Sequence, residues 1–596
     1  MDHTLKRISS LLMALIMLTL CACGAVTDQT ETSSEAVSEE TRSVSAAETA
    51  AFAEYTNKLF IYLVTSDPIT LAYTLSDPEA YGITDTYITL SPIDTDDPSL
   101  DYTDYYGFLS ELYTFDYSSL SDEDQLTYDV LEEYLTTFIA GEEFLWEEEL
   151  FGPYSGLQSY IPIELAEYAI ESEDDIETYL SLLSDIYDYL VSAADFEVMR
   201  AAQGYVMPSS AISEVIEACE EFINAGDDNL LLTSFEERLS ALSLSDADLA
   251  SYTEQNRQLV EEQVIPAFIY IVETLESIDG TGTNSQGLCY YENGTAYYEW
   301  LIDYMIGSSY SCEELMSLIL DRIDSQLLDL YTLLYNDSSL YTQYLEYSDE
   351  RTPEEILEAL QEAISEDYPA LQTDAVYEIK YVPSSLESMT SPAFYMIPPI
   401  DSPDENVIYI NESSTDSSSI FSTLAHEGYP GHLYQTVYSA YALSDPVRRL
   451  TEYVGYTEGW GLYVEFESYY MDTTISEDLA GVLSLNSSIV LGVYAYLDLG
   501  IHYAGWTMDE AKAVMTEYFG ELDADTVASV YNTIVSEPAY YLKYYVGYLE
   551  LILMREEAES VLGGDFSLLE FHTFILDIGS CAFCVINEYF DEWLYG

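Results

Sequence analysis

Apolar residues recur at three- and four-residue intervals along most of this chain, which is the pattern of helices with one buried face. The pattern breaks at connectors rich in Pro, Asp, Ser or Gly, such as residues 91–98 and 279–283. The predicted helices cover residues 51–63, 126–138, 176–199, 212–223, 259–278, 296–306, 313–335 and 353–364, and helices return from residue 417 to the C-terminus. The fold class is therefore predicted to be mainly α.

Two short runs alternate between apolar and polar positions and are rich in β-branched side chains, which indicates strands. They are residues 375–382 and 406–411. We expect a small antiparallel β element next to the helix that begins near residue 417. The second run could be a sheet edge to which an extended peptide adds as another strand.

The N-terminus has the features of an export signal. Lys6 and Arg7 precede an apolar run, residues 11–20, that is too short to span a bilayer comfortably. The run ends in a Leu-Cys-Ala-Cys-Gly sequence, which resembles a bacterial lipobox with Cys23 as the lipidated residue. The alternative is an ordinary secreted protein whose signal happens to contain cysteine. Residues 24–47 contain almost no large apolar side chain, so they are predicted to be a flexible tether.

The length predicts more than one folded region, because 596 residues exceed what one compact core usually fills. The connector at 279–283 is the best internal boundary. It separates an N-terminal helical region, residues 48–285, from a second helical region, residues 286–596, which carries the candidate chemistry described below.

Acidic residues outnumber basic ones by 110 to 15, and the formal net charge is −95. This charge repels nucleic acid and anionic lipid head groups, so neither is an expected partner. We interpret the acid excess as a solvated surface that keeps an exported protein soluble. Contact with a membrane is expected only through lipid at Cys23. The sequence does not indicate an oligomeric state.

The strongest candidate for chemistry is the segment His-Glu-Gly-Tyr-Pro-Gly-His, which starts at His426. The chain has only five histidines, and two of them lie within these seven positions. A His-Glu pair on a helix begins the zinc-hydrolase signature, in which the imidazole binds the metal and the carboxylate takes a proton from water. The second histidine of that signature follows four residues later. Here Pro430 holds that position, and His432 lies two residues further on, about 120° around an unbroken helix from His426.

Pro430 and Gly431 offer a physical solution to this spacing. Proline lacks a backbone N–H and glycine tolerates backbone angles that other residues avoid, so the pair could bulge or end the helix. His432 could then reach the same ion as His426. The alternative is that His432 caps a helix or lies on the surface, and that any metal uses other ligands.

A third metal ligand is required, and the following helix offers several carboxylates. Glu458 is the best candidate because the small residues Gly455, Gly459 and Gly461 surround it and would allow a close approach of helices. Glu465, seven residues later, lies near the same helix face and could orient a ligand through a hydrogen bond.

Several motifs together resemble a bacterial family that is catalogued as domain of unknown function 885. They are His426-Glu-x-x-Pro-Gly-His432, Glu458-Gly-Trp-Gly-Leu-Tyr-x-Glu465, Asp498-x-Gly-Ile-His502-x-x-Gly-Trp506, Pro538-x-x-x-Leu-x-Tyr544-x-x-Gly547 with Arg555, and Phe571-His572. The resemblance covers roughly residues 50–596. The family is similar to mostly helical zinc-dependent peptidases of the gluzincin type, which implies a large zincin-like helical bundle with a deep cleft. Leu433 and Ala539 stand where family members often carry histidine and glycine.

The resemblance implies one zinc ion held by His426, His432 and Glu458, with Glu427 as the general base. It also makes His502 and Tyr544 candidates to hydrogen-bond the oxyanion of the reaction. Each of these two residues has an alternative as a buried, satisfied polar side chain.

Basic residues are scarce, so those in the catalytic half are candidates for binding substrate. Lys543 lies beside Tyr544, and Arg555 follows on the same predicted helix. A cation near the cleft could bind the terminal carboxylate of a peptide, which would favour exopeptidase activity.

The sequence thus predicts a zinc-dependent hydrolase that cleaves peptide bonds of short peptides, as an exopeptidase or an oligopeptidase. It would lie in the bacterial cell envelope outside the cytoplasm, anchored by lipid at Cys23. The alternatives are a metal-dependent amidase or esterase with a non-peptide substrate, and a lipoprotein that binds peptides or solutes without turnover. Glu427 distinguishes the last alternative, because a binding protein needs no base beside a metal ligand.

Overall fold

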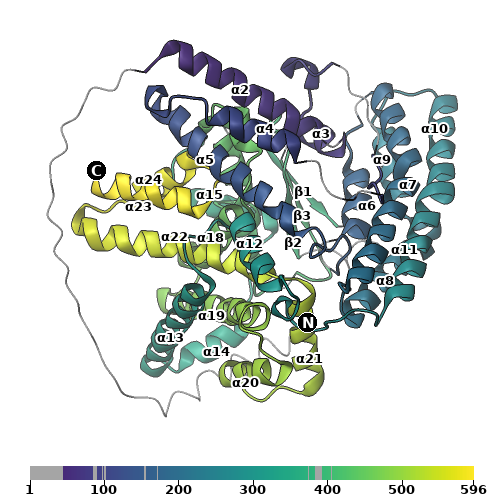
Figure 1. The fold of residues 1–596 in the computed structure, drawn as a ribbon. Coiled ribbons are helices and arrows are strands. Elements are labelled where there is room, and N and C mark those ends of the chain that lie inside the picture. The colour runs from purple at the N-terminus through teal and green to yellow at the C-terminus, as the bar shows by residue number, and fades with distance from the viewer. Residues whose placement is uncertain are drawn as a thin grey trace.

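The computed structural model describes residues 44–596 except 67, 85–89, 97, 99–101, 154–155, 171, 374, 383–391, 405 and 416. The predicted export signal, Cys23 and nearly all of the predicted tether lie outside the described residues. The described part is mainly helical with one small sheet (Figure 1), which confirms the predicted fold class. All eight helices predicted before residue 365 overlap an observed helix.

The N-terminal part forms two groups of helices, and each group has its own hydrophobic core. The first group is α2 (Ala46–Thr65), α3 (Pro68–Thr74), α4 (Thr103–Leu112) and α5 (Asp122–Ala140). The second group is α6 (Leu157–Glu167), α7 (Glu173–Gln203), α8 (Ser209–Asn224), α9 (Leu230–Ser240), α10 (Asp246–Leu259) and α11 (Ile265–Ile278). In the second group α11 packs against α7 and α8, and the facing side chains Leu183, Val215 and Ile271 are fully buried. Figure 1 shows this second group along one side of the molecule.

The C-terminal part is built around three helices that contact one another, α18, α19 and α22. Its helices are α12 (Gly294–Met305), α13 (Cys312–Asn336), α14 (Ser339–Glu346), α15 (Pro353–Ala363), α16 (Ile420–Glu427), α17 (His432–Ala442), α18 (Val454–Met471), α19 (Glu477–His502), α20 (Met508–Phe519), α21 (Ala524–Ser536), α22 (Tyr540–Leu562), α23 (Leu568–Ile578) and α24 (Phe583–Tyr595). Helix α5 of the N-terminal part packs against α12 and α24. The division at residues 285 and 286 stays a prediction.

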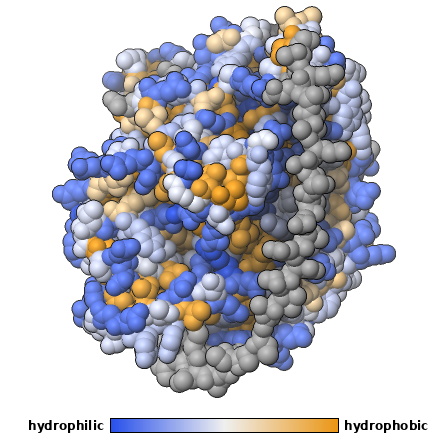
Figure 2. Space-filling view, turned by 90° about the vertical axis from the view of Figure 1, so that its left-hand side faces the viewer, coloured by the Kyte–Doolittle hydropathy of each residue, from blue (hydrophilic) through white to orange (hydrophobic). Residues whose placement is uncertain are grey.

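The abundant acidic residues help to start the helices. Among the helices of the described residues, five begin with a capping box. In it a Ser or Thr side chain accepts from a backbone N–H in the first turn, and an acidic side chain accepts from the backbone N–H of that Ser or Thr. These helices are α5, α7, α13, α15 and α20. Negative charge in the first turn also interacts favourably with the helix dipole. Many remaining polar residues lie on the surface, and hydrophilic residues predominate on the face in Figure 2.

One helix in the described part, α19, is long and apolar enough to cross a membrane by length and composition. It lies against α13, α18 and α22, and 56% of its most apolar window is buried inside the protein. Leu497, Leu499 and Ile501 are fully buried there. The protein core therefore accounts for the apolar composition of α19.

The sheet has the order β1-β3-β2, with β1 (Tyr377–Tyr381), β2 (Ala393–Met396) and β3 (Asn406–Ile410). Strand β1 is parallel to β3, and β2 is antiparallel to β3. The predicted antiparallel element is present as the pair of β2 and β3 next to α16, but the two strands that the sequence indicated, β1 and β3, are parallel to each other. The prediction that residues 406–411 form an edge of the sheet is wrong, because β3 is paired on both sides. The edge beside α16 is β2, which the sequence analysis missed.

Candidate metal centre and active-site cavity

The candidate metal centre begins where α16 ends. Helix α16 stops at Glu427 and α17 starts at His432, so Pro430 and Gly431 interrupt the helix as predicted. A Cβ atom at Gly431 would lie 1.8 Å from the carbonyl oxygen of His426. Only glycine fits at this position. The close approach brings the start of α17 against the end of α16.

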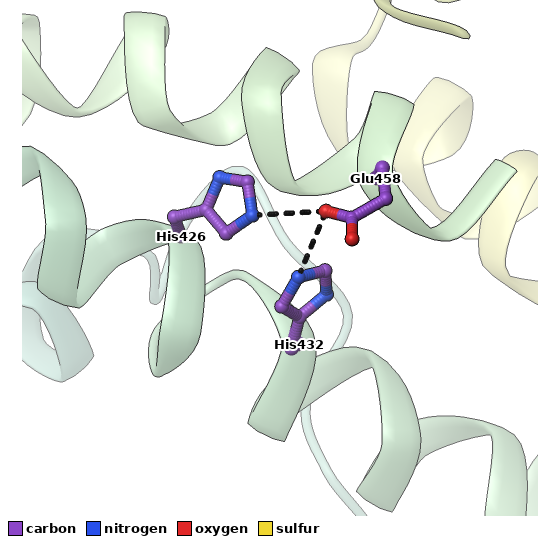
Figure 3. Close-up of side chains that lie close together, drawn as sticks. All are labelled: His426, His432 and Glu458. Carbon is purple, nitrogen blue, oxygen red and sulfur yellow. Dashed lines mark hydrogen bonds and ion pairs between the residues drawn. The ribbon is translucent and has the colours of Figure 1, made fainter. Parts of the chain in front are cut away.

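This fold brings His426 and His432 to one carboxylate of α18 (Figure 3). The distance from His426 Nε2 to Glu458 Oε2 is 3.3 Å, and the distance from His432 Nε2 to the same oxygen is 3.4 Å. The three candidate ligand atoms all lie within 4.8 Å of one another. A Cβ atom at Gly461 would lie 2.7 Å from His426 Nε2, so this glycine lets the imidazole sit directly on α18. His432 is the first residue of α17, but its side chain lies with those of His426 and Glu458 and not on the surface, while the residues that would hold a metal stay a prediction.

Glu465 lies about two turns after Glu458 on α18 and contacts the other ring nitrogen of His426. The distance between His426 Nδ1 and Glu465 Oε2 is 3.2 Å. If Nδ1–H donates to this carboxylate, the Nε2 lone pair points to the space shared with His432 and Glu458. This carboxylate–histidine arrangement is the one that fixes the tautomer of metal-binding histidines.

The donor set and its spacing fit a zinc ion. Ligand atoms about 2.0–2.1 Å from a tetrahedral zinc lie about 3.3–3.4 Å from each other. The two nitrogen–oxygen distances, 3.3 and 3.4 Å, agree with this geometry, and all three ligand atoms lie within 4.8 Å of one another. Two imidazoles and one carboxylate also form the three-ligand set of catalytic zinc sites, which leave a further position open.

The charges around His426 give a second reason to expect a cation here. Burial alone would lower the pKa of His426, but hydrogen bonds with Glu458 and Glu465 and the charge of Glu427 raise this pKa well above its ordinary value. For Glu458, burial would raise the pKa, but the two histidines lower it strongly. The carboxylates therefore require positive charge between them, which either protons or a metal ion supply.

Glu427 lies beside the candidate ligands and is held by the sheet. Its Oε2 accepts a hydrogen bond of 2.9 Å from the backbone N–H of Tyr395, in β2. Burial raises the pKa of Glu427, while the neighbouring histidines act in the opposite direction. The sequence analysis missed Tyr395, because its contribution is a backbone group and β2 has only four residues.

A cavity of about 400 Å³ contains the candidate centre. Its walls include His426, His432 and Glu458 together with Glu427, Glu465, Tyr544 and residues 393–395 of β2. Burial and the charge of Glu458 raise the pKa of Tyr544 well above its ordinary value, so its phenol stays protonated. Tyr544 thus presents a protonated phenol at the cavity wall, and its hydrogen bond to an oxyanion stays a prediction.

The structure does not bring His502 to this cavity. Its Nδ1 accepts from the backbone N–H of Leu288 at 3.1 Å, and its Nε2 lies 2.7 Å from the carbonyl oxygen of Ile534. Both ring nitrogens are therefore used, and burial lowers the pKa of His502 to about 4. The expected contact of His502 with an oxyanion is corrected to the alternative, a buried and satisfied side chain.

The two predicted substrate-binding cations differ in their placement. Arg555 is engaged by Glu467 at 2.9 Å and Glu559 at 3.0 Å and does not line the cavity around the candidate centre, so its predicted role is corrected to a structural one. Lys543 lines a neighbouring cavity of about 320 Å³ and lies over the rings of Tyr540 and Tyr544. Burial lowers its pKa.

The fold and the site define a mainly helical protein with two histidines and a glutamate that converge in a cavity. The family described as "Bacterial protein of unknown function (DUF885)" matches residues 90–588, and the chain belongs to this family. A search of curated proteins found no match.

Two solved structures share the fold. One is described as "the putative lipoprotein from Colwellia psychrerythraea", with 18% identity and a TM-score of 0.79 over 92% of this chain and 99% of that chain. The other is described as "a putative lipoprotein of unknown function from Shewanella oneidensis", with 16% identity and a TM-score of 0.59 over 90% of this chain and 99% of that chain.

Proposed function

We propose that this protein is a zinc-dependent hydrolase that cleaves peptide bonds of short peptides. The observation that carries the proposal is the convergence of His426, His432 and Glu458, with Glu427 directly beside them. A site that only bound metal would need the first three residues and no adjacent carboxylate. The test is to compare the metal content and the peptide cleavage of the wild type and a Glu427→Gln variant.

The residues of the chain have separate roles in the proposed reaction. Zinc held by the two histidines and Glu458 would polarise the peptide carbonyl and lower the pKa of a water molecule. Glu427 accepts the proton of the attacking water and transfers it to the leaving amine. The phenol of Tyr544 donates a hydrogen bond to the carbonyl oxygen as negative charge develops on it. Tyr395 N–H keeps one oxygen of Glu427 fixed, so the other is free for the water.

Strand β2 is the element that would align a peptide substrate. Residues 393–395 line the cavity, and among the described residues β2 pairs with a strand on one edge only, that of β3. An extended peptide can bind along such an edge with backbone hydrogen bonds, whatever its sequence. This role replaces the one predicted for residues 406–411.

We also propose that the protein is anchored to the outside of the bacterial cytoplasmic membrane by lipid at Cys23. The lipobox-like sequence supports this location, as do the names of the two related structures. If the protein does not cleave peptides, two alternatives follow. It is then a hydrolase that acts on a non-peptide amide or ester, or a lipoprotein that binds peptides or solutes without turnover.

Replacing Glu465 with Gln is expected to weaken zinc binding by about 10- to 100-fold, because His426 loses the charged acceptor for its Nδ1–H. Titration with a competing chelator measures this affinity. Glu477→Gln on α19 is the control, because Glu477 is exposed and does not line the cavity. Equal affinities in the two variants would show that Glu465 does not support the metal.

Replacing Lys543 with Met tests whether the enzyme recognises the C-terminal carboxylate of a peptide. We expect the ratio of kcat/KM for free over C-terminally amidated peptides to fall by about tenfold, because one charge-assisted hydrogen bond is lost. Methionine keeps the packing between Tyr540 and Tyr544. An unchanged ratio would assign Lys543 to packing alone and leave the peptidase proposal intact.

A further inference from the structure

A cavity of about 450 Å³ adjoins the candidate metal centre on the side of Glu465. It shares His426, Glu465 and Tyr544 with the cavity that holds the centre. A group that passed from the centre into the larger cavity would therefore pass these three side chains. The two cavities therefore share part of their walls.

The walls of this cavity come from continuous faces of two helices. On α18, the residues Leu462, Glu465, Phe466 and Tyr469 follow the i, i+3, i+4, i+7 spacing of one helix face, and the candidate ligand Glu458 lies on the same face. On α19, the lining residues run from Leu483 to Tyr494 with the same spacing. The candidate ligand Glu458 and one part of the cavity wall are thus held by the same helix, α18.

The chemistry of these walls is unusual for a chain with 110 acidic residues. Among the described residues that line the cavity, only His426 and Glu465 belong to the charged types or histidine, and both lie at the end that faces the centre. Seven of the lining residues are tyrosines. The neighbouring cavity around Lys543 is different, since Glu147, Glu149 and Glu537 line it. The uncharged walls are therefore a local property of one side of the centre.

Two pairs of polar groups in the uncharged walls bond to each other, whereas the buried atoms Tyr347 Oη and Ser414 Oγ have no hydrogen-bond partner among the described residues. Ser422 Oγ lies 3.1 Å from Tyr469 Oη, and Asn486 Nδ2 donates to Tyr344 Oη at 3.1 Å. An entering charged side chain would lose its water without gaining an opposite charge, which is costly. An aromatic or large aliphatic side chain would instead gain contact with several rings.

We propose that this cavity is the specificity subsite for an aromatic or large apolar side chain on the residue next to the cleaved bond. The proposal rests on the proposed peptidase function and names the class of peptide that the site selects. Its volume, about 450 Å³, lies in the range of cavities that bind small ligands. The hydrophobic contact predicts that peptides with Phe at this position have kcat/KM values about 10- to 100-fold above peptides with Ala, and that Glu is worse than Ala.

The first test uses matched peptides that carry Phe, Leu, Ala, Glu or Lys at each position beside the cleaved bond. The wild type is assayed for kcat/KM, and the Glu427→Gln variant is titrated with the same peptides by calorimetry. Binding that favours Phe without any cleavage would support the subsite and overturn the peptidase function. Cleavage without a preference for Phe or Leu would overturn the subsite and support the peptidase function. Absence of both would overturn both.

A cavity-filling variant, Leu491→Trp, locates the preference in this cavity. Leu491 lies on the lining face of α19, so the indole should occupy the space that we assign to the substrate. We expect the ratio of kcat/KM for Phe over Ala peptides to fall at least about tenfold. Leu328→Trp is the control, because Leu328 is 59% exposed on α13. A fully folded Leu491→Trp protein with the wild-type ratio would overturn the assignment, and Leu491→Ala, which should instead favour larger side chains, covers a failure to fold.

Discussion

Replacing Glu427 with Gln is expected to remove peptide hydrolysis and to leave the zinc content unchanged. The amide keeps the size of the carboxyl group but cannot accept the proton of the attacking water. A loss of about 10²- to 10⁴-fold in kcat is expected for the removal of a general base. The hydrogen bond from Tyr395 N–H can still reach the amide oxygen, so the fold around α16 should persist. Hydrolysis of a peptide mixture and elemental analysis of the purified variant measure the two properties.

Glu452→Gln is the control for this experiment. Glu452 lines the same cavity but accepts a hydrogen bond from Thr457 and contacts neither histidine within ion-pair distance. Its replacement should change kcat by less than about threefold. Equal losses in both variants would indicate a general electrostatic effect of the cavity and would contradict a specific role of Glu427.

Replacing Gly431 with Ala is expected to damage the fold and the metal centre together. The added Cβ would lie 1.8 Å from the carbonyl oxygen of His426 and 2.4 Å from that of Ala425, and neither backbone atom can move aside cheaply. The start of α17 must shift, which takes His432 away from Glu458. We expect the free energy of unfolding to fall by about 2–4 kcal/mol and zinc affinity to fall at least about tenfold.

Gly107→Ala is the matched control, because a Cβ at Gly107 in α4 would meet no atom within 4 Å. Alanine is the better helix former there, so this variant should be as stable as the wild type or more stable by up to about 1 kcal/mol. Denaturant unfolding and chelator titration of both variants provide the comparison. A Gly431→Ala protein with wild-type stability and zinc affinity would show that the close approach of α16 and α17 does not shape the centre.

The sequence was sufficient to predict most of the long helices that bury a continuous face and the break at Pro430-Gly431, but not the short buried helices α6 and α9. Helix α7 shows why the first prediction works, since Ile176, Leu183 and Leu190 recur on one face and are fully buried. Helix α10 was not predicted because only Asn256 is buried along it, so its sequence has no apolar periodicity. The position of the candidate ligand Glu458 was predictable from the small residues beside it, of which Gly461 permits the contact with His426.

Features that depend on long-range contacts could not be read from the sequence. The order of the strands places β3 in the centre, and nothing in the sequence of residues 406–411 indicates which of its edges is paired. The placement of the His502 side chain could not be predicted for the same reason. A histidine near the end of an apolar helix has the same local sequence whether it faces a cavity or, as here, bonds to Leu288 and Ile534.

Anomalous X-ray diffraction above and below the zinc absorption edge, on crystals of protein prepared with zinc, tests the central claim most directly. We predict one strong zinc peak within about 2.0–2.2 Å of His426 Nε2, His432 Nε2 and a carboxylate oxygen of Glu458. The absence of a zinc peak among these three residues would contradict the account.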